Sequence, residues 1–181
     1  PQAKIRHDPM KSLKIGIAGH GLVGKRRHRY IDEHPAMTVV AVSDQKYADG
    51  AGGPSGLRSY GDFRELIAAE RLDALFVCLP NAEAAEATIL GLEHGMHVFC
   101  EKPPGRTVAD IRQVREVEMR HPGRKLKYGF NHRYHDSVLE ALSLIQGGSL
   151  GTVINIRGVY GKSVLTPKIE GVEDLEDPAY W

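Results

Sequence analysis

The sequence predicts an α/β protein with a doubly wound parallel sheet of the Rossmann type, followed by the incomplete start of a second, α+β domain. Three observations carry this prediction. Short β-branched runs alternate with segments of helical periodicity, most of the runs are apolar on both faces, and a glycine-rich turn follows the first of them. Parallel strands buried on both faces give such continuous apolar runs, and they need helical crossovers between them.

Five segments are predicted to be strands, because each is short and rich in apolar, β-branched or aromatic residues. They are KIGIA at 14–18, TVVAVS at 38–43, ALFVCL at 74–79, HVFC at 97–100 and KLKYGF at 125–130. The segment 45–59 contains A-G-G-P-S-G and is predicted to be a loop rather than a unit of its own. Because helical segments separate the strands, the order β-α-β-α-β-α-β indicates a doubly wound sheet.

The helix ends carry recognisable signals. Two starts resemble capping boxes, in which an N-cap residue is followed three positions later by an acid, and two stops carry glycine. The starts are Asp62 with Glu65 and Thr107 with Asp110, and the stops are Gly95 and the pair Gly147–Gly148.

Composition excludes several classes of protein. Charged residues make up 26%, apolar residues 41%, and the net charge is +1. No apolar run approaches the roughly 18 residues that a membrane span needs, so we expect a soluble protein without a membrane partner. Nucleic-acid binding is not expected at this net charge, and the basic run 25–29 is interpreted as a largely solvated helix face. Cys78 and Cys100 lack C-x-x-C spacing, which predicts buried reduced thiols and a cytoplasmic location.

The motif G-x-G-x-x-G is weak alone, but here it follows the first strand directly and opens a helix. Gly19 is expected to make the tight turn, Gly21 to let backbone amides approach a pyrophosphate, and Gly24 to let the helix pack closely on the strand. The positive end of the helix would then face the phosphates. The intervening loop residues predicted to bind the cofactor are His20, Leu22 and Val23.

Asp44 ends the second strand twenty residues after Gly24. In this position a carboxylate accepts hydrogen bonds from the adenosine ribose hydroxyls and repels a 2′-phosphate, which favours NAD over NADP. Lys46 leaves use of both cofactors open. The alternative is a tight turn followed by an unrelated acid.

Two further strands end in Leu79-Pro80-Asn81 and in Glu101-Lys102-Pro103-Pro104, at the sheet edge where open α/β sheets bind ligands. The ordered set of G-x-G-x-x-G with a terminal Asp, L-P-N, E-K-P and G-F-N-H-R-Y resembles the Gfo/Idh/MocA family of sugar dehydrogenases. The family is named after glucose-fructose oxidoreductase, inositol dehydrogenase and rhizopine catabolism. Matching segments run from Leu13 to about Tyr160.

The resemblance implies that Lys102 lies beside the nicotinamide and the substrate hydroxyl, where it takes part in proton transfer as hydride leaves the carbon. It also implies that Arg133 contacts the cofactor or an anionic substrate group and that Asn131 contacts the sugar. A solvent-facing Lys102 is the alternative for the first role, and interdomain packing is the alternative for the other two. The cofactor-binding residues implied at the strand ends and beyond are Leu79, Pro80, Asn81, Glu101, Lys102 and Arg133.

A dinucleotide-binding domain is predicted over 13–133 and the start of a substrate domain over 134–181. A helix over 136–146 and a strand TVINIRGVYG at 152–161 would begin the second domain. The resemblance implies that this domain is a largely antiparallel sheet that covers the substrate and forms a homo-oligomer interface. The family's D-x-G-x-H segment has no match in this sequence, so the chain is either part of a longer protein or a truncated relative.

Two functions remain. The first is an NAD-dependent oxidoreductase that transfers hydride between the nicotinamide and a hydroxyl carbon of a sugar, cyclitol or nucleotide-linked sugar. The last substrate class rests on R-G-V-Y-G-K-S at 157–163, which resembles members acting on such sugars. The second is a non-catalytic dinucleotide-binding sensor or scaffold. His132 and His135 have H-x-x-H spacing but no carboxylate partner in sequence, so no metal site is predicted.

Overall fold

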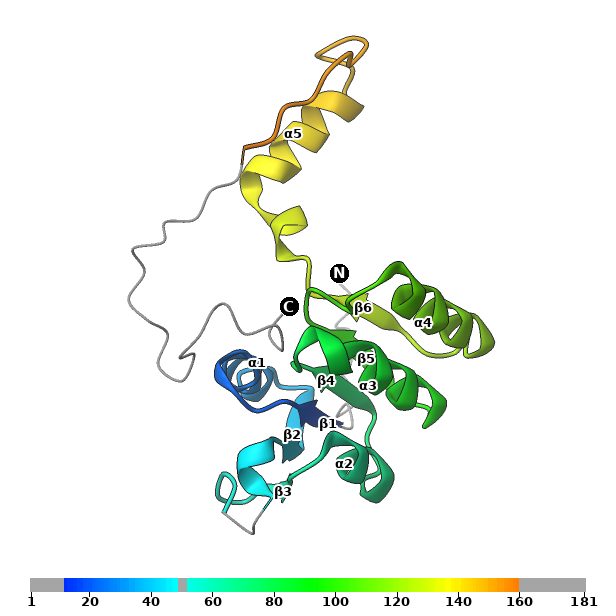
Figure 1. The fold of residues 1–181 in the computed structure, drawn as a ribbon. Coiled ribbons are helices and arrows are strands. Elements are labelled where there is room, and N and C mark those ends of the chain that lie inside the picture. Colours follow the sequence, from blue (N-terminus) through cyan, green and yellow to red (C-terminus); the bar gives the residue numbers. More distant parts are fainter. Residues whose placement is uncertain (1–11, 49–51, 160–181) are drawn as a thin grey trace, which may run out of the picture. The chain divides into compact units, whose positions relative to one another are not determined.

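The computed structural model describes residues 12–48 and 52–159 (Figure 1). These residues belong to two compact units, the first ending at Gly129 and the second beginning at Phe130. The domain boundary predicted after residue 133 stays a prediction. Among the described residues, no helix combines the length and the apolar character that crossing a membrane would require.

The described part of the first unit is built on one parallel sheet, as the sequence predicted, with six strands where five were expected. Its strand order is β3-β2-β1-β4-β5-β6, which is the doubly wound Rossmann order. The order reverses between β1 and β4, so the crevice that binds ligands in such sheets lies at the carboxyl ends of these two strands. The strands are β1 (Leu13–Ala18), β2 (Met37–Ser43), β3 (Arg58–Tyr60), β4 (Ala74–Val77), β5 (His97–Cys100) and β6 (Leu126–Tyr128).

Helices cover both faces of this sheet (Figure 1). On one face, Ile31 of α1 packs with the β1 side chains Ile15 and Ile17, and on the other face the larger core includes residues of α2, α3 and α4. The helices of the first unit are α1 (Leu22–Asp32), α2 (Phe63–Ala69), α3 (Asn81–Glu93) and α4 (Val108–Arg120), with a 3-10 turn η1 (Gln45–Tyr47). The second unit contains η2 (Asn131–Tyr134) and α5 (Asp136–Gln146).

The helix ends confirm most of the predicted signals. Thr107 and Asp110 form a reciprocal capping box at the start of α4. Asp62 caps α2 by accepting a hydrogen bond from the Arg64 backbone N–H at 2.7 Å. Gly95 follows α3 with a φ of 78°, a backbone conformation that favours glycine.

The prediction of a loop over 45–59 was wrong in part, because it missed η1 and the start of β3. Apolar periodicity could not reveal β3, since Arg58, Ser59 and Tyr60 form a three-residue edge strand that pairs only with β2. Side-chain bonds hold this edge. The buried Glu70 carboxylate accepts hydrogen bonds from Arg58 Nη2 and from Tyr60 Oη, each at 2.6 Å. Burial alone would raise the pKa of Glu70, but these two donors hold it below its usual value.

The strand predicted over 152–161 was also wrong for its described part, because residues 152–159 form neither helix nor strand. The last two positions lie outside the described residues. An alternating pattern becomes a strand only when a neighbouring strand satisfies its backbone groups. The described part of the second unit contains no strand that could do so.

Candidate functional site

The loops that follow β1, β2 and β4 are joined by backbone hydrogen bonds at the carboxyl edge of the sheet. Gly19 N donates to Ser43 O at 2.9 Å, and Cys78 N donates to Ala18 O at 2.7 Å. These bonds place the glycine-rich turn between the ends of the two neighbouring strands. The turn therefore lies at the point where the strand order reverses.

The three motif glycines meet different surroundings. Gly19 has a φ of 88°, and a side-chain Cβ built there would lie 2.5 Å from Cys78 O. A Cβ at Gly24 would lie 2.0 Å from Gly19 O, so the first turn of α1 and the loop before it touch through backbone. A Cβ at Gly21 would meet no atom of the described residues within 4 Å. Packing therefore requires the first and third glycines, whereas open space lies over the second.

The amino end of α1 is open at its first turn. Its N-cap is Gly21, no side chain of the described residues caps it, and its first turn holds no acidic residue. The first backbone N–H groups of a helix have no partner within the helix and carry a partial positive charge. Leu22 and Val23 in this turn are exposed. An open cradle of N–H groups beside a glycine without a close neighbour fits the pyrophosphate of a dinucleotide.

Asp44 lies after β2 and is tied to the glycine turn by Lys46. Its carboxylate accepts from Lys46 N at 3.3 Å and from Lys46 Nζ at 3.1 Å. The same ammonium donates to the backbone oxygen of His20 at 2.8 Å. The Asp44 side chain is 21% exposed, which leaves its oxygens accessible to ribose hydroxyls. Because the ammonium offsets part of its charge, dual cofactor use stays an open prediction.

His20 was predicted to bind the cofactor as part of the turn, but its side chain has a second role that the sequence did not signal. The ring is only 3% exposed and bonds Tyr47 Oη at 2.9 Å and His28 Nδ1 at 3.0 Å. Burial, helped by the neighbouring His28 and Lys46, lowers the pKa of His20 to about 4. The ring is therefore neutral at physiological pH.

The E-K-P segment after β5 is anchored by a residue that sequence reasoning missed. Arg27 Nε of α1 donates to Glu101 Oε1 at 2.6 Å, and the guanidinium lies 4.9 Å from the centre of the Phe99 ring. Beside this pair a Cβ on Gly129 would lie 2.7 Å from Glu101 Oε2. The Glu101 carboxylate is thus held by the protein, while the adjacent Lys102 is exposed. Within the described ranges, no side chain pairs with the Lys102 ammonium.

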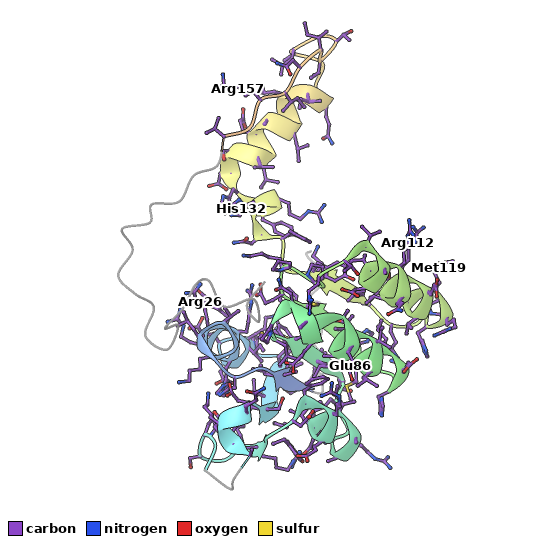
Figure 2. The ribbon with its side chains drawn as sticks, viewed as in Figure 1. Arg26, Glu86, Arg112, Met119, His132 and Arg157 are labelled. Carbon is purple, nitrogen blue, oxygen red and sulfur yellow. The ribbon has the colours of Figure 1, made fainter. Side chains whose placement is uncertain are left out.

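The remaining residues of the basic run in α1 face solvent, as predicted. Lys25, Arg26 and Arg29 are exposed, and Figure 2 shows Arg26 projecting from the outer side of the helix. Arg27 and His28, in contrast, turn toward the site and are partly buried.

The L-P-N segment joins β4 to α3. Pro80 is the N-cap of α3 and Asn81 its first residue, while the Leu79 side chain packs against the larger core. Asn131 and Arg133 lie in η2 of the second unit. The predicted contacts of these five residues with cofactor or substrate stay predictions.

The cysteines and histidines add no metal centre to the parts of the chain that the structure describes. There, no group of three or more His, Cys, Asp or Glu side chains is arranged to hold a metal ion. The rings of His132 and His135 stack with their centres 4.7 Å apart. Cys78 and Cys100 are free thiols, and burial raises their pKa values to about 12 and about 11. Thiols of this kind are poor nucleophiles at neutral pH.

Known proteins resemble this chain in sequence and fold. Residues 13–130 match a family model described as an oxidoreductase family with an NAD-binding Rossmann fold. Inositol 2-dehydrogenase of Klebsiella pneumoniae subsp. pneumoniae is 32% identical over 152 residues, covering 81% of this chain and 45% of the relative. Inositol 2-dehydrogenase of Salmonella typhimurium is 27% identical, covering 87% and 48%. The chain therefore spans about half the length of these relatives.

Solved structures agree. A crystal structure of scyllo-inositol dehydrogenase from Lactobacillus casei with bound NAD(H) and scyllo-inositol matches with a TM-score of 0.70 at 30% identity. The match covers 78% of this chain and 43% of that one.

The buried His20 makes the stability of the fold depend on pH. The unfolded chain takes up a proton on this residue near pH 6.5, whereas the folded chain does so only near pH 4. Acid therefore favours unfolding, and we expect this residue to remove up to about 3 kcal/mol of stability between these two pH values. Urea unfolding of the wild type and of His20→Gln at pH 7 and pH 4.5 measures this. Parallel pH dependence in the two proteins would contradict the prediction.

Proposed function

The chain belongs to the Gfo/Idh/MocA oxidoreductase family, and on this basis we propose that its first unit binds NAD for hydride transfer between the nicotinamide and a hydroxyl carbon of a polyhydroxylated substrate. The observation that carries the proposal is the amino end of α1, which no described side chain caps, which lies beneath open space at Gly21 and whose preceding turn is tied by Lys46 to the Asp44 carboxylate. This combination supports an anion site and a ribose site in one crevice.

Each part of the crevice has a proposed task. The loop Gly19–Gly24, with His20, Leu22 and Val23, would bind the pyrophosphate through backbone N–H groups, and Asp44 would accept the ribose hydroxyls. Leu79, Pro80 and Asn81 would border the cofactor at the end of β4. NAD, when bound, supplies the hydride acceptor. Lys102, as the free amine, would accept the proton of the substrate hydroxyl as hydride leaves the carbon, because its exposed side chain next to the anchored Glu101 is available for that contact.

The proposed substrate class is a sugar or cyclitol. It rests on family membership and on relatives named as inositol 2-dehydrogenases, of which this chain spans about half. Asn131 and Arg133 would contribute substrate or cofactor contacts from the second unit. A nucleotide-linked sugar is the finer alternative, and its signal at 157–163 lies mostly outside the described residues.

A cytoplasmic location and a homo-oligomer are further parts of the proposal. The free thiols of the partly buried Cys78 and the buried Cys100 suit a reducing compartment. The apolar residues Leu139, Leu142 and Ile145 of α5 recur at helical spacing and would suit a covered surface in the second domain.

Gly21→Ala tests the anion site. Its Cβ would meet no atom in the part of the chain that the structure describes, but it would stand in the space proposed for the pyrophosphate. We therefore expect an unchanged melting temperature and at least a roughly tenfold loss of NAD affinity by calorimetric titration. Gly123→Ala is the matched control, because its Cβ also meets open space but lies outside the crevice. Equal NAD affinity in both variants would remove the main support for the proposal.

Asp44→Ser tests the choice between NAD and NADP. Loss of a charged acceptor should weaken NAD binding about tenfold or more, and loss of the negative charge beside Lys46 should improve NADP binding. Titration of both cofactors into wild type and variant measures the ratio. Asp62→Ser is the control, since Asp62 caps α2 as Asp44 caps η1. Wild-type protein that binds NADP more tightly than NAD would contradict the role of Asp44.

Lys102→Ala separates an enzyme from a non-catalytic sensor. If Lys102 handles the hydroxyl proton, the variant of the full natural protein should bind NAD normally and lose about a hundredfold or more in turnover. NADH formation with a panel of inositols and glucosides measures this, with the exposed Lys125→Ala as control. Turnover that persists in Lys102→Ala would assign proton transfer to another group, and absence of turnover in the wild type would favour the sensor.

A further inference from the structure

Four polar side chains form a continuous hydrogen-bonded chain behind the glycine turn, and the proposed chemistry does not use them. Tyr47 Oη and His20 Nδ1 are 2.9 Å apart, His20 Nε2 and His28 Nδ1 are 3.0 Å apart, and His28 Nε2 lies 3.2 Å from Asp32 Oδ2. The chain thus joins η1 to the turn and the turn to the last residue of α1. Exposure increases along it, from His20 at 3% to the Asp32 side chain at 57%.

Burial keeps the His20 ring neutral, so one of its nitrogens donates and the other accepts. Its bonds to Tyr47 and His28 therefore run in the same sense along the chain. Where His20 donates to His28 through Nε2–H, its Nδ1 accepts from the Tyr47 hydroxyl. At the far end of the chain an ionised Asp32 can only accept, so His28 donates to it through Nε2–H.

The same residue, His20, is held from η1 at two points. Lys46 Nζ bonds its backbone oxygen at 2.8 Å, and Tyr47 bonds its ring. Asp44, which would hold the ribose, caps η1, and its backbone oxygen accepts from Tyr47 N at 2.9 Å. A movement of Tyr47 would therefore also move the Asp44 carboxylate relative to the glycine turn.

We infer that Tyr47, His20 and His28 are positioning residues that hold Asp44 at a set distance from the pyrophosphate cradle, so that the adenosine half of the cofactor meets a preorganised site. The inference rests on the proposed function and deepens it. Preorganisation matters because ordering a loop at the moment of binding reduces affinity without changing any direct contact.

Tyr47→Phe and His28→Leu interrupt the chain on the two sides of His20, and neither substituted residue is itself proposed to contact the cofactor. Each should weaken binding of NAD and of ADP-ribose about three- to tenfold, the scale of one hydrogen bond. Binding of nicotinamide mononucleotide should not change, because it lacks the adenosine half. The double variant should lose no more than either single variant, since both interrupt the same chain. Tyr30→Phe, at an exposed tyrosine of α1, is the matched control.

Calorimetric titration of the 181-residue chain with the three ligands gives the result directly. Tyr47→Phe that binds NAD within twofold of the wild type would overturn the inference, as would additive losses in the double variant. An equal loss for nicotinamide mononucleotide would also overturn it, because a general structural defect lowers all three affinities. Wild-type protein that binds none of the ligands would instead refute the proposed function, and the inference with it.

Discussion

The first unit depends on the close approach of the β1–α1 turn to the end of β4. At Gly19 and Gly24 backbone meets backbone, with no room for a single extra carbon. This contact brings the amino end of α1 over the point where the strand order reverses. The helix dipole, the N–H groups of its first turn and the sheet edge then meet in one place, with Asp44 at the end of β2 on one side and Lys102 after β5 on the other.

Two carboxylates at this edge, those of Asp44 and Glu101, are each held by a cation. Lys46 ties Asp44 to the glycine turn, and Arg27 of α1 ties Glu101 to the helix whose amino end is the proposed anion site. Such pairs are partly exposed, so their value lies less in net stability than in orientation. They fix the two strand ends that would contact opposite halves of a dinucleotide, while the Lys102 ammonium stays exposed.

The buried His20 is an unusual residue for a turn that is proposed to lie against phosphate. A turn residue that must approach phosphate would ordinarily be small, yet here an imidazole is buried at 3% exposure. Its burial is tolerated because both ring nitrogens have partners, which removes the penalty of an unsatisfied polar group. His20 also joins the glycine turn to η1, because its ring bonds Tyr47 and its backbone oxygen accepts from Lys46.

Local patterns in the sequence alone predicted most of the strands, the glycine turn and a helix start. Apolar runs located five of the six strands, glycine spacing located the turn, and capping signals located the start of α4, because burial and backbone conformation leave periodic or local traces. The edge strand Arg58–Tyr60 left no such trace, because it is held by hydrogen bonds from Arg58 and Tyr60 to Glu70, the residue that ends α2. The pattern over 152–161 predicted a strand that its described part does not form.

Only the tertiary structure decided that Arg27 meets Glu101 and that Tyr47, His20 and His28 form one hydrogen-bonded chain. These partners lie on separate elements, and which of them touch depends on the order and packing of strands rather than on any repeat along the chain.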